Sequence, residues 1–375
     1  MSSFKALGLS AAMQANLDQL GYQQPTPVQA EAVPLALAGK DVIAMAQTGS
    51  GKTAAFGIPI IETIDPRRFQ VQSLVLCPTR ELADQVAKAL RELARAKDNV
   101  KVLTLCGGVP IGPQIGSLSH GAHIVVGTPG RVDDHLRKGT LSLDGLKVLV
   151  LDEADRMLDM GFEEVVTSIV SQSPGGRQTL LFSATWPPAI RKLSEQFQSK
   201  PEDVRVESKA ATITIEESFY EIQPDQRAAA VAALLSRFQP VSSLVFCTTK
   251  RDCDELSDEL GRLGFSALSL HGDLDQRERD SALVRFANQS CTVLVATDVA
   301  ARGLDIKGLP LVINAEPARD PEVHTHRVGR TGRAGEQGHA VTLCTPRQGH
   351  KITRLETERG EPVLWGDTEA LLAEA

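Results

Sequence analysis

The chain has 375 residues and a formal net charge of −7 at pH 7, with a hydrophobic share of 42% and a charged share of 23%. This composition is typical of a globular protein, and the length exceeds what one hydrophobic core usually supports, so we expect two domains. The acidic charge argues against a protein that binds phosphate backbones by bulk electrostatics. Any nucleic-acid site should therefore be local.

Composition also bears on location and redox chemistry. No apolar run approaches the roughly 20 residues that span a bilayer, and the N-terminus "MSSFKALGLSAAMQ" does not resemble a signal peptide. We therefore expect a cytoplasmic protein without membrane contact. The six cysteines form no C-x-x-C pair, and several stand inside apolar runs, which favours buried thiols over disulfides or zinc.

Two series of apolar, strand-like runs follow one another along the chain. The first contains "DVIAMA", "SLVLC", "KVLTLC", "HIVVGT", "VLVLDEA" and "TLLFSAT", and the second contains "SSLVFCTT", "SALSLHG", "TVLVATD" and "LVINAE". Helical periodicity lies between the runs, for example over residues 81–94 and 250–263. This β-α-β pattern, met twice, predicts an α/β fold with two tandem, doubly wound parallel sheets.

A polar, weakly periodic stretch, "RVESKAATITIEES", separates the two series. It predicts a linker at residues 207–213, between an N-terminal domain at 1–206 and a C-terminal domain at 214–375. The final residues, 346–375, are polar and then acidic. Their sequence predicts no chemistry.

"AQTGSGKT", residues 46–53, follows a strand and precedes a helix, which is the context of a phosphate-binding loop. Gly49 and Gly51 allow backbone N–H groups to face phosphates, Lys52 can reach the β and γ oxygens, and the Thr53 hydroxyl can hold Mg²⁺. Ala46 stands where the general pattern has its first glycine. The alternative is a plain glycine-rich turn at the start of a helix.

"VLVLDEADRM", residues 148–157, is a run of branched apolar residues that ends in carboxylates. Such a short run predicts a strand buried on both faces, so its charges belong at the carboxyl edge of the sheet, where open α/β sheets bind ligands. Asp152 stands where a phosphate-bound Mg²⁺ needs an acidic group. Glu153 can orient and deprotonate the attacking water.

Seven motifs in order resemble the DEAD-box ATP-dependent RNA helicases: "AQTGSGKT", "PTRELADQ", "TPGR", "DEAD", "SAT", "ATDVAARGLD" and "HRVGRTGRAG". The resemblance covers about residues 4 to 345 and is strongest to the bacterial DbpA-like branch. It implies two RecA-like domains, an RNA-stimulated ATP hydrolase, and local RNA duplex unwinding by domain closure. It also implies a monomeric core that works in ribosomal RNA remodelling or ribosome assembly. That branch carries a further basic RNA-binding domain, which we do not expect within these residues.

The resemblance also assigns the nucleotide contacts. "GYQQPTPVQ" is similar to the family's Q motif, in which Gln29 reads the adenine edge, so ATP is preferred. Tyr22 is a candidate to stack on the purine, although it could instead pack the N-terminal extension together with Phe4. Mg²⁺ would be held by Thr53 and Asp152, partly through water. The implied nucleotide contacts are Tyr22, Thr26, Gln29, Gln47, Thr48, Gly49, Ser50, Gly51, Lys52, Thr53 and Asp305.

Catalysis and coupling are implied in the same way. Arg330 and Arg333 of "HRVGRTGR" resemble arginine fingers on the γ-phosphate of ATP held by the other domain. His326 is placed near that phosphate. Ser183, Thr185 and Asp155 resemble the residues that couple hydrolysis to strand separation. The implied catalytic set is Lys52, Asp152, Glu153, His326, Arg330 and Arg333.

Aromatic residues make up only 4% of the chain, too few for a surface that reads bases by stacking, so an RNA groove should follow the backbone. The RNA contacts implied by the resemblance are Pro78, Thr79, Arg80, Gly108, Thr128, Gly130, Arg131, Arg279 and Thr297. Two alternatives stay open: a DNA-directed helicase of the same superfamily, and an ATP-gated RNA clamp without unwinding. The presence of Glu153, Arg330 and Arg333 disfavours the clamp.

Overall fold

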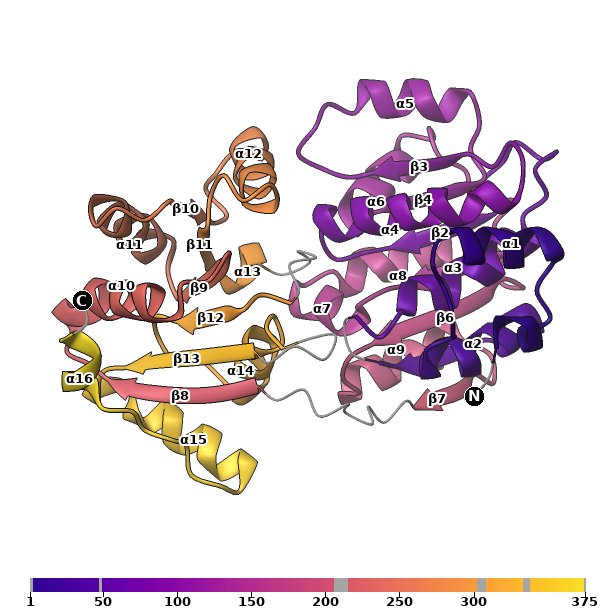
Figure 1. Cartoon of the computed structure of the whole chain (residues 1–375). Coiled ribbons are helices and arrows are strands. Elements are labelled where there is room, and N and C mark those ends of the chain that lie inside the picture. Colours follow the sequence, from indigo (N-terminus) through magenta and orange to yellow (C-terminus); the bar gives the residue numbers. More distant parts are fainter. Residues whose placement is uncertain (1–2, 47–48, 206–214, 302–307, 333–337, 374–375) are drawn as a thin grey trace. The chain divides into compact units, whose positions relative to one another are not determined.

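The computed structural model of the chain describes residues 3–46, 49–205, 215–301, 308–332 and 338–373. The chain divides into two compact units, Met1–Lys209 and Ala210–Ala375, and each has its own sheet (Figure 1). Within the described residues, no helix is long and apolar enough to cross a membrane.

The first unit is built on a seven-stranded sheet in the order β3-β4-β2-β5-β6-β1-β7. Every recorded pair of neighbouring strands is parallel, as the repeated β-α-β pattern predicts. The strands are β1 (Val42–Met45), β2 (Ser73–Leu76), β3 (Val102–Leu105), β4 (Ile124–Gly127), β5 (Val148–Leu151), β6 (Gln178–Ser183) and β7 (Glu202–Arg205).

Helices cover both faces of this sheet. Successive strand residues point to opposite faces, and Val75 accordingly packs in one core with Phe56 and Leu90, whereas Leu74 packs in the other with Ile169. The helices are α1 (Ala11–Gln19), α2 (Pro27–Leu37), α3 (Lys52–Thr63), α4 (Arg80–Leu93), α5 (Gly112–Ser119), α6 (Pro129–Arg137), α7 (Ala154–Asp159), α8 (Glu163–Ser171) and α9 (Pro188–Phe197).

The second unit contains a six-stranded sheet in the order β10-β11-β9-β12-β13-β8, again with parallel neighbours. Its strands are β8 (Ile215–Glu221), β9 (Ser243–Cys247), β10 (Ala267–Leu270), β11 (Val293–Thr297), β12 (Leu311–Asn314) and β13 (Gly338–Cys344). Its helices are α10 (Arg227–Phe238), α11 (Lys250–Arg262), α12 (Gln276–Ala287), α13 (Asp298–Ala301), α14 (Pro321–Val328), α15 (Gly349–Arg359) and α16 (Thr368–Leu372).

The last described residues belong to this second unit. Phe219 of β8 donates its backbone N–H to Leu364 O, and Gly366 donates to Phe219 O, so the chain after α15 runs beside the outer strand of the sheet. Ile352 and Leu355 of α15 form a small core with Phe219. The stretch without predicted chemistry therefore protects an otherwise open sheet edge.

The two RecA-like sheets confirm the predicted fold class. The strands predicted from apolar runs are present, and the helices predicted at 81–94 and 250–263 are α4 and α11. The sequence did not single out β7, β8 or β13. The predicted linker, 207–213, lies outside the described residues. All six cysteines are free and buried, as predicted.

Candidate functional site

Three motifs meet at the carboxyl edge of the first sheet. The phosphate-loop sequence follows β1, "DEAD" follows β5 and "SAT" ends β6, and these strands are neighbours in the order β5-β6-β1. Because parallel strands end at the same edge, residues more than 100 positions apart in sequence come together there. The sequence alone placed each motif at a strand end, and the strand order brings them to one site.

The described part of the phosphate loop has the backbone that its glycines predict. Gly49 and Gly51 have φ of 89° and 92°, and Gly51 immediately precedes α3, whose first two residues are Lys52 and Thr53. A Cβ on Gly51 would lie 2.4 Å from Gln29 Nε2, so a larger residue would displace that amide. Ser50 is also described here, whereas Gln47 and Thr48 lie outside the described residues.

Lys52 and Asp152 are buried, and each has a polar side-chain atom without a hydrogen-bond partner in the described chain. The two residues are 6% and 2% exposed, and the atoms concerned are Lys52 Nζ and Asp152 Oδ1, while the Asp152 carboxyl also accepts from the Glu153 backbone. Burial raises the pKa of the Asp152 carboxyl to about 6, and the Lys52 ammonium opposes this rise. Buried polar atoms are nearly always paired, so an unpaired cation and an unpaired carboxylate oxygen fit a ligand that offers both anionic oxygens and a metal.

A magnesium ion fits these residues as part of a phosphate complex. In the described ranges, no three His, Cys, Asp or Glu side chains gather in a metal-binding group. Mg²⁺ usually takes only one or two protein oxygens and completes its shell with phosphates and water. Asp152 and the Thr53 hydroxyl offer that limited set of oxygens.

Glu153 immediately precedes the short helix α7, and its side chain is bound to a residue of that helix. Its carboxylate oxygen Oε2 accepts a hydrogen bond from Arg156 Nη1 at 2.6 Å, and both side chains are buried. The sequence analysis did not assign Arg156. The sequence carries a signal for this ion pair, because an acidic and a basic residue three positions apart on a helical turn are neighbours.

Asp155 connects the acidic motif to the end of β6. Its Oδ2 accepts hydrogen bonds from the backbone N–H groups of Ala184 and Thr185, at 3.1 and 2.9 Å, and from the Thr185 hydroxyl at 3.0 Å. Ser183 Oγ is buried without a hydrogen-bond partner in the described chain. The structure thus brings Asp155 and Thr185 into direct contact, the pair that the resemblance assigns to coupling.

The Q-motif residues lie beside the phosphate loop. Gln29 is 2% exposed and uses both ends of its amide: Oε1 accepts from Thr26 N at 3.0 Å, and Nε2 donates to Gly51 O at 3.1 Å. Tyr22 is half-buried and meets Phe4 edge to face, with ring centroids 6.1 Å apart, while Phe4 is buried in the core. Gln29 is therefore positioned at the loop, and reading of adenine by Gln29 and Tyr22 stays a prediction.

The RNA residues predicted in the first unit lie at the ends of β2, β3 and β4, which are neighbours on the other half of the sheet. Thr79 begins α4 and accepts from Leu82 N, Thr128 begins α6, and Gly108 has φ of 74°. The same edge thus carries the nucleotide motifs on one half and these residues on the other. Pro78 and Gly130 adjoin Thr79 and Thr128 in sequence.

Two arginines of this group differ in their surroundings. Arg131 donates from Nη1 to Gln114 Oε1 and from Nη2 to Val109 O, both at 2.9 Å, so it holds the loop after β3. Arg80 has two buried guanidinium nitrogens, Nε and Nη1, without a hydrogen-bond partner in the described chain. Arg80 therefore offers donors to an anionic ligand, whereas Arg131 already has protein partners.

The second unit holds the remaining predicted residues. Arg327 is 2% exposed and donates to both carboxylate oxygens of Asp298 at 2.6 and 2.8 Å, and its guanidinium lies 5.1 Å from the Phe246 ring centroid. This ties α14 to the end of β11, a link that the sequence did not indicate. Arg330 is 6% exposed and follows α14.

Other predicted residues of this unit lie on three different elements. His326 lies in α14, Thr297 ends β11, and Arg279 lies in α12. Asp305 and Arg333 lie outside the described residues.

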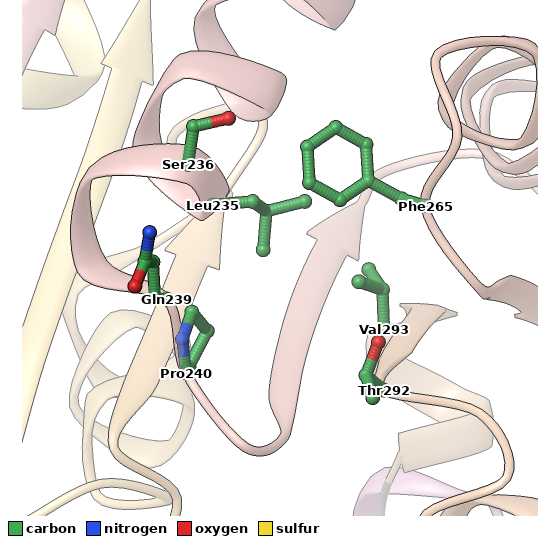
Figure 2. Close-up of a pocket in the computed structure, with 7 residues that line it drawn as sticks. All are labelled: Leu235, Ser236, Gln239, Pro240, Phe265, Thr292 and Val293. Atoms are coloured by element: carbon green, nitrogen blue, oxygen red, sulfur yellow. The ribbon is translucent and has the colours of Figure 1, made fainter.

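A pocket of about 390 Å³ also opens on the second unit, between the end of α10 and the start of β11 (Figure 2). Leu235, Phe265 and Val293 form its apolar lining. No residue predicted from the sequence lines this pocket. It lies at the amino end of β11, whereas Thr297 lies at the carboxyl end.

A glycine-rich loop at the start of a helix, a buried lysine and an acidic strand end on a parallel sheet define a nucleotide-binding α/β protein of the phosphate-loop class. Residues 26–193 match the DEAD/DEAH box helicase family model, and residues 226–335 match the helicase conserved C-terminal domain. The chain belongs to the DEAD-box helicase family.

The relatives agree with this membership. The chain is 57% identical to the ATP-dependent RNA helicase DbpA of Escherichia coli (strain K12), over 94% of this chain and 77% of that protein. It is 46% identical to the DEAD-box ATP-dependent RNA helicase CshA of Geobacillus kaustophilus (strain HTA426), over 95% of this chain and 76% of the relative. A structure of S. cerevisiae Dbp5 bound to RNA and ADP BeF3 matches with a TM-score of 0.88 at 28% identity, covering 100% of this chain and 99% of the other.

Proposed function

We propose that the chain is an ATP-dependent RNA helicase, in which RNA-stimulated ATP hydrolysis is coupled to local separation of RNA strands. The observation that carries the proposal is that buried Lys52 Nζ and buried Asp152 Oδ1, next to Glu153, lack hydrogen-bond partners in the described chain. The family membership and the named relatives support RNA as the second ligand.

The residues of the first unit fit distinct tasks in hydrolysis. Lys52 binds the β and γ phosphate oxygens. Thr53 and Asp152 would hold Mg²⁺, and the ion would supply positive charge that neutralises the phosphates. Glu153 orients the water and accepts its proton as the water oxygen bonds the γ-phosphorus. The bond from phosphorus to the leaving oxygen breaks, and ADP and phosphate are released.

Coupling to RNA is assigned to two parts of the chain. Asp155 and Thr185 link the acidic motif to the end of β6, so a change at one is transmitted to the other. We further propose that Arg330 and Arg333 of the second unit act on the γ-phosphate and stabilise its developing charge, an effect that contributes about 10³ to 10⁵ in rate in related phosphoryl transfers. ATP and RNA then each tighten binding of the other, because both favour the same closed state.

Finer features of the proposal rest on the resemblance to the DbpA-like branch. They are a monomeric core and a role with ribosomal RNA. A linker at 207–213 between two helicase domains and a cytoplasmic location are proposed instead from the polar stretch and the composition of the sequence. The role with ribosomal RNA has a direct test. It is to measure how far a panel of RNAs, including ribosomal fragments, stimulates ATP turnover.

The function is tested by measuring ATP turnover with RNA and with DNA of the same sequence. We expect RNA to stimulate turnover and DNA not to, and Glu153→Gln to remove turnover while ATP still binds. Equal stimulation by DNA would favour a DNA-directed helicase. Unwinding of a short RNA duplex must accompany turnover, because binding without strand separation would leave an ATP-gated clamp.

A further inference from the structure

The carboxylate of Glu153 is paired with a cation that the family motifs do not assign. Arg156 Nη1 donates to Glu153 Oε2 at 2.6 Å, and the side chains of Arg156 and Glu153 are 8% and 4% exposed. Breaking a buried ion pair by removing one partner leaves a charge that costs several kcal/mol. The two side chains therefore hold each other in place.

The backbone brings this pair together. Glu153 precedes α7 with φ of 53° and ψ of 52°, in the left-handed region that non-glycine residues seldom adopt and that is enriched at functional sites. Arg156 is the third residue of α7, the position from which a side chain reaches back to the residue before the helix. The left-handed backbone of Glu153 and the hydrogen bond from Arg156 together fix the position of the Glu153 carboxylate.

The neighbouring carboxylates have different partners. Lys52 is the cation that opposes the rise in the pKa of Asp152. Asp155 accepts from the Thr185 hydroxyl through Oδ2 and from Arg156 N, at 3.0 Å, through Oδ1. Arg156 therefore contacts Asp155 through its backbone and Glu153 through its guanidinium, so it joins the coupling residue to the predicted base.

We propose that Arg156 is a positioning residue for ATP hydrolysis: its guanidinium fixes Oε2 of Glu153, so that the carboxylate meets the attacking water in one orientation. The inference rests on the proposed function. A misplacement of about 1 Å can cost a factor of about 100 in rate. Loss of the guanidinium should thus lower kcat and leave the binding of ATP unchanged, because Arg156 acts through Glu153.

The test compares Arg156→Gln and Arg156→Lys with the wild type in RNA-stimulated ATP turnover. For Arg156→Gln we expect kcat to fall at least tenfold, with KM for ATP and the affinity for a fluorescent ADP analogue within twofold of the wild type. Arg156→Lys keeps the charge but loses the fork of donors, so it should recover part of the rate and stay at least threefold below the wild type. Arg137→Gln is the matched control, since the Arg137 side chain is 70% exposed and is paired with Asp133 at 2.9 Å within α6.

Two results would overturn this role. One is a wild-type kcat in the glutamine variant, or in the lysine variant if the glutamine variant does not fold. The other is a fall in kcat accompanied by an equal loss of nucleotide affinity or of folded protein, which would make the ion pair merely structural. Absence of turnover in the wild type would instead refute the proposed function itself.

Discussion

Replacing Asp152 by Asn should stabilise the unliganded protein at neutral pH while removing ATP turnover. Burial raises the pKa of this carboxyl from an ordinary value of 3.8 to about 6. Folding therefore favours the protonated form of Asp152. Its contribution to stability is fully present below pH 3.8 and is lost as the pH rises through 6.

The size of the effect follows from the difference of about two pKa units, each corresponding to about 1.4 kcal/mol. Above pH 6 the ionised carboxyl lowers the free energy of unfolding by about 3 kcal/mol, and Asn, which carries no charge, removes that penalty. For a domain of about 200 residues this corresponds to a rise of about 6 to 12 °C in Tm. At pH 4.5 the advantage of Asn should be only about 1 kcal/mol.

The assay is chemical unfolding of the unliganded wild type and Asp152→Asn between pH 4.5 and 7.5. The control is Asp18→Asn, at an exposed carboxyl in α1. A stability difference that does not grow with pH, or an Asn variant less stable than the wild type at pH 7.5, would refute the reasoning about burial of this charge.

Three further predictions concern backbone and thiols. Gly51→Ala should weaken binding of a fluorescent ADP analogue at least fivefold. A φ of 92° strains alanine by about 1 to 2 kcal/mol, and the new Cβ would displace the Gln29 amide. An unchanged affinity for the analogue would contradict this prediction. Gly366→Ala should destabilise the second unit by about 1 to 3 kcal/mol, because the new Cβ would lie 2.3 Å from the Tyr220 ring. Urea unfolding measures this loss. A wild-type unfolding midpoint would show that the segment around Gly366 does not pack against Tyr220. All six cysteines are buried, and burial raises the pKa of Cys344 to about 11. A thiol reagent at pH 8 should therefore label none of them in the folded protein and all six after unfolding. Rapid labelling of the folded protein would contradict this prediction.

The fold was largely predictable because most strands are short apolar runs. The run 148–151 is a fully buried strand in the structure, and the carboxylates after it lie at the sheet edge as expected. β7 could not be found this way, since three of its four residues are charged and only Val204 is apolar and buried. Its place comes from pairing with β1, a contact that local sequence does not encode.

The candidate site was predictable in its residue types and less so in its contacts. The apolar runs predicted that the motifs containing Lys52, Asp152 and Glu153 follow strands. The pairing of Glu153 with Arg156 depends on the left-handed backbone at Glu153. Glycine usually marks such a backbone in a sequence, and this position is not a glycine. The bonds of Arg131 to Gln114 and to the loop after β3 likewise depend on tertiary packing.

The resemblance assigned a task to Arg330 and left the residues after 345 without one. The structure places Arg330 at the end of α14, which is held through Arg327 and Asp298. It also shows that Phe219, Ile352 and Leu355 make the C-terminal stretch part of the second unit's core. Long-range packing of this kind leaves no local pattern in a polar sequence.

The central claim is that ATP held by the first unit is hydrolysed only with the help of arginine side chains from the second. Its most direct test is single-turnover ATP hydrolysis at saturating RNA by the wild type and by Arg330→Gln, with Arg319→Gln as a control at an exposed arginine paired with Asp320. We expect Arg330→Gln to lose about a factor of 10³ in rate while its ATP affinity and the Arg319→Gln rate stay at the wild-type level. A wild-type rate in Arg330→Gln would contradict the claim.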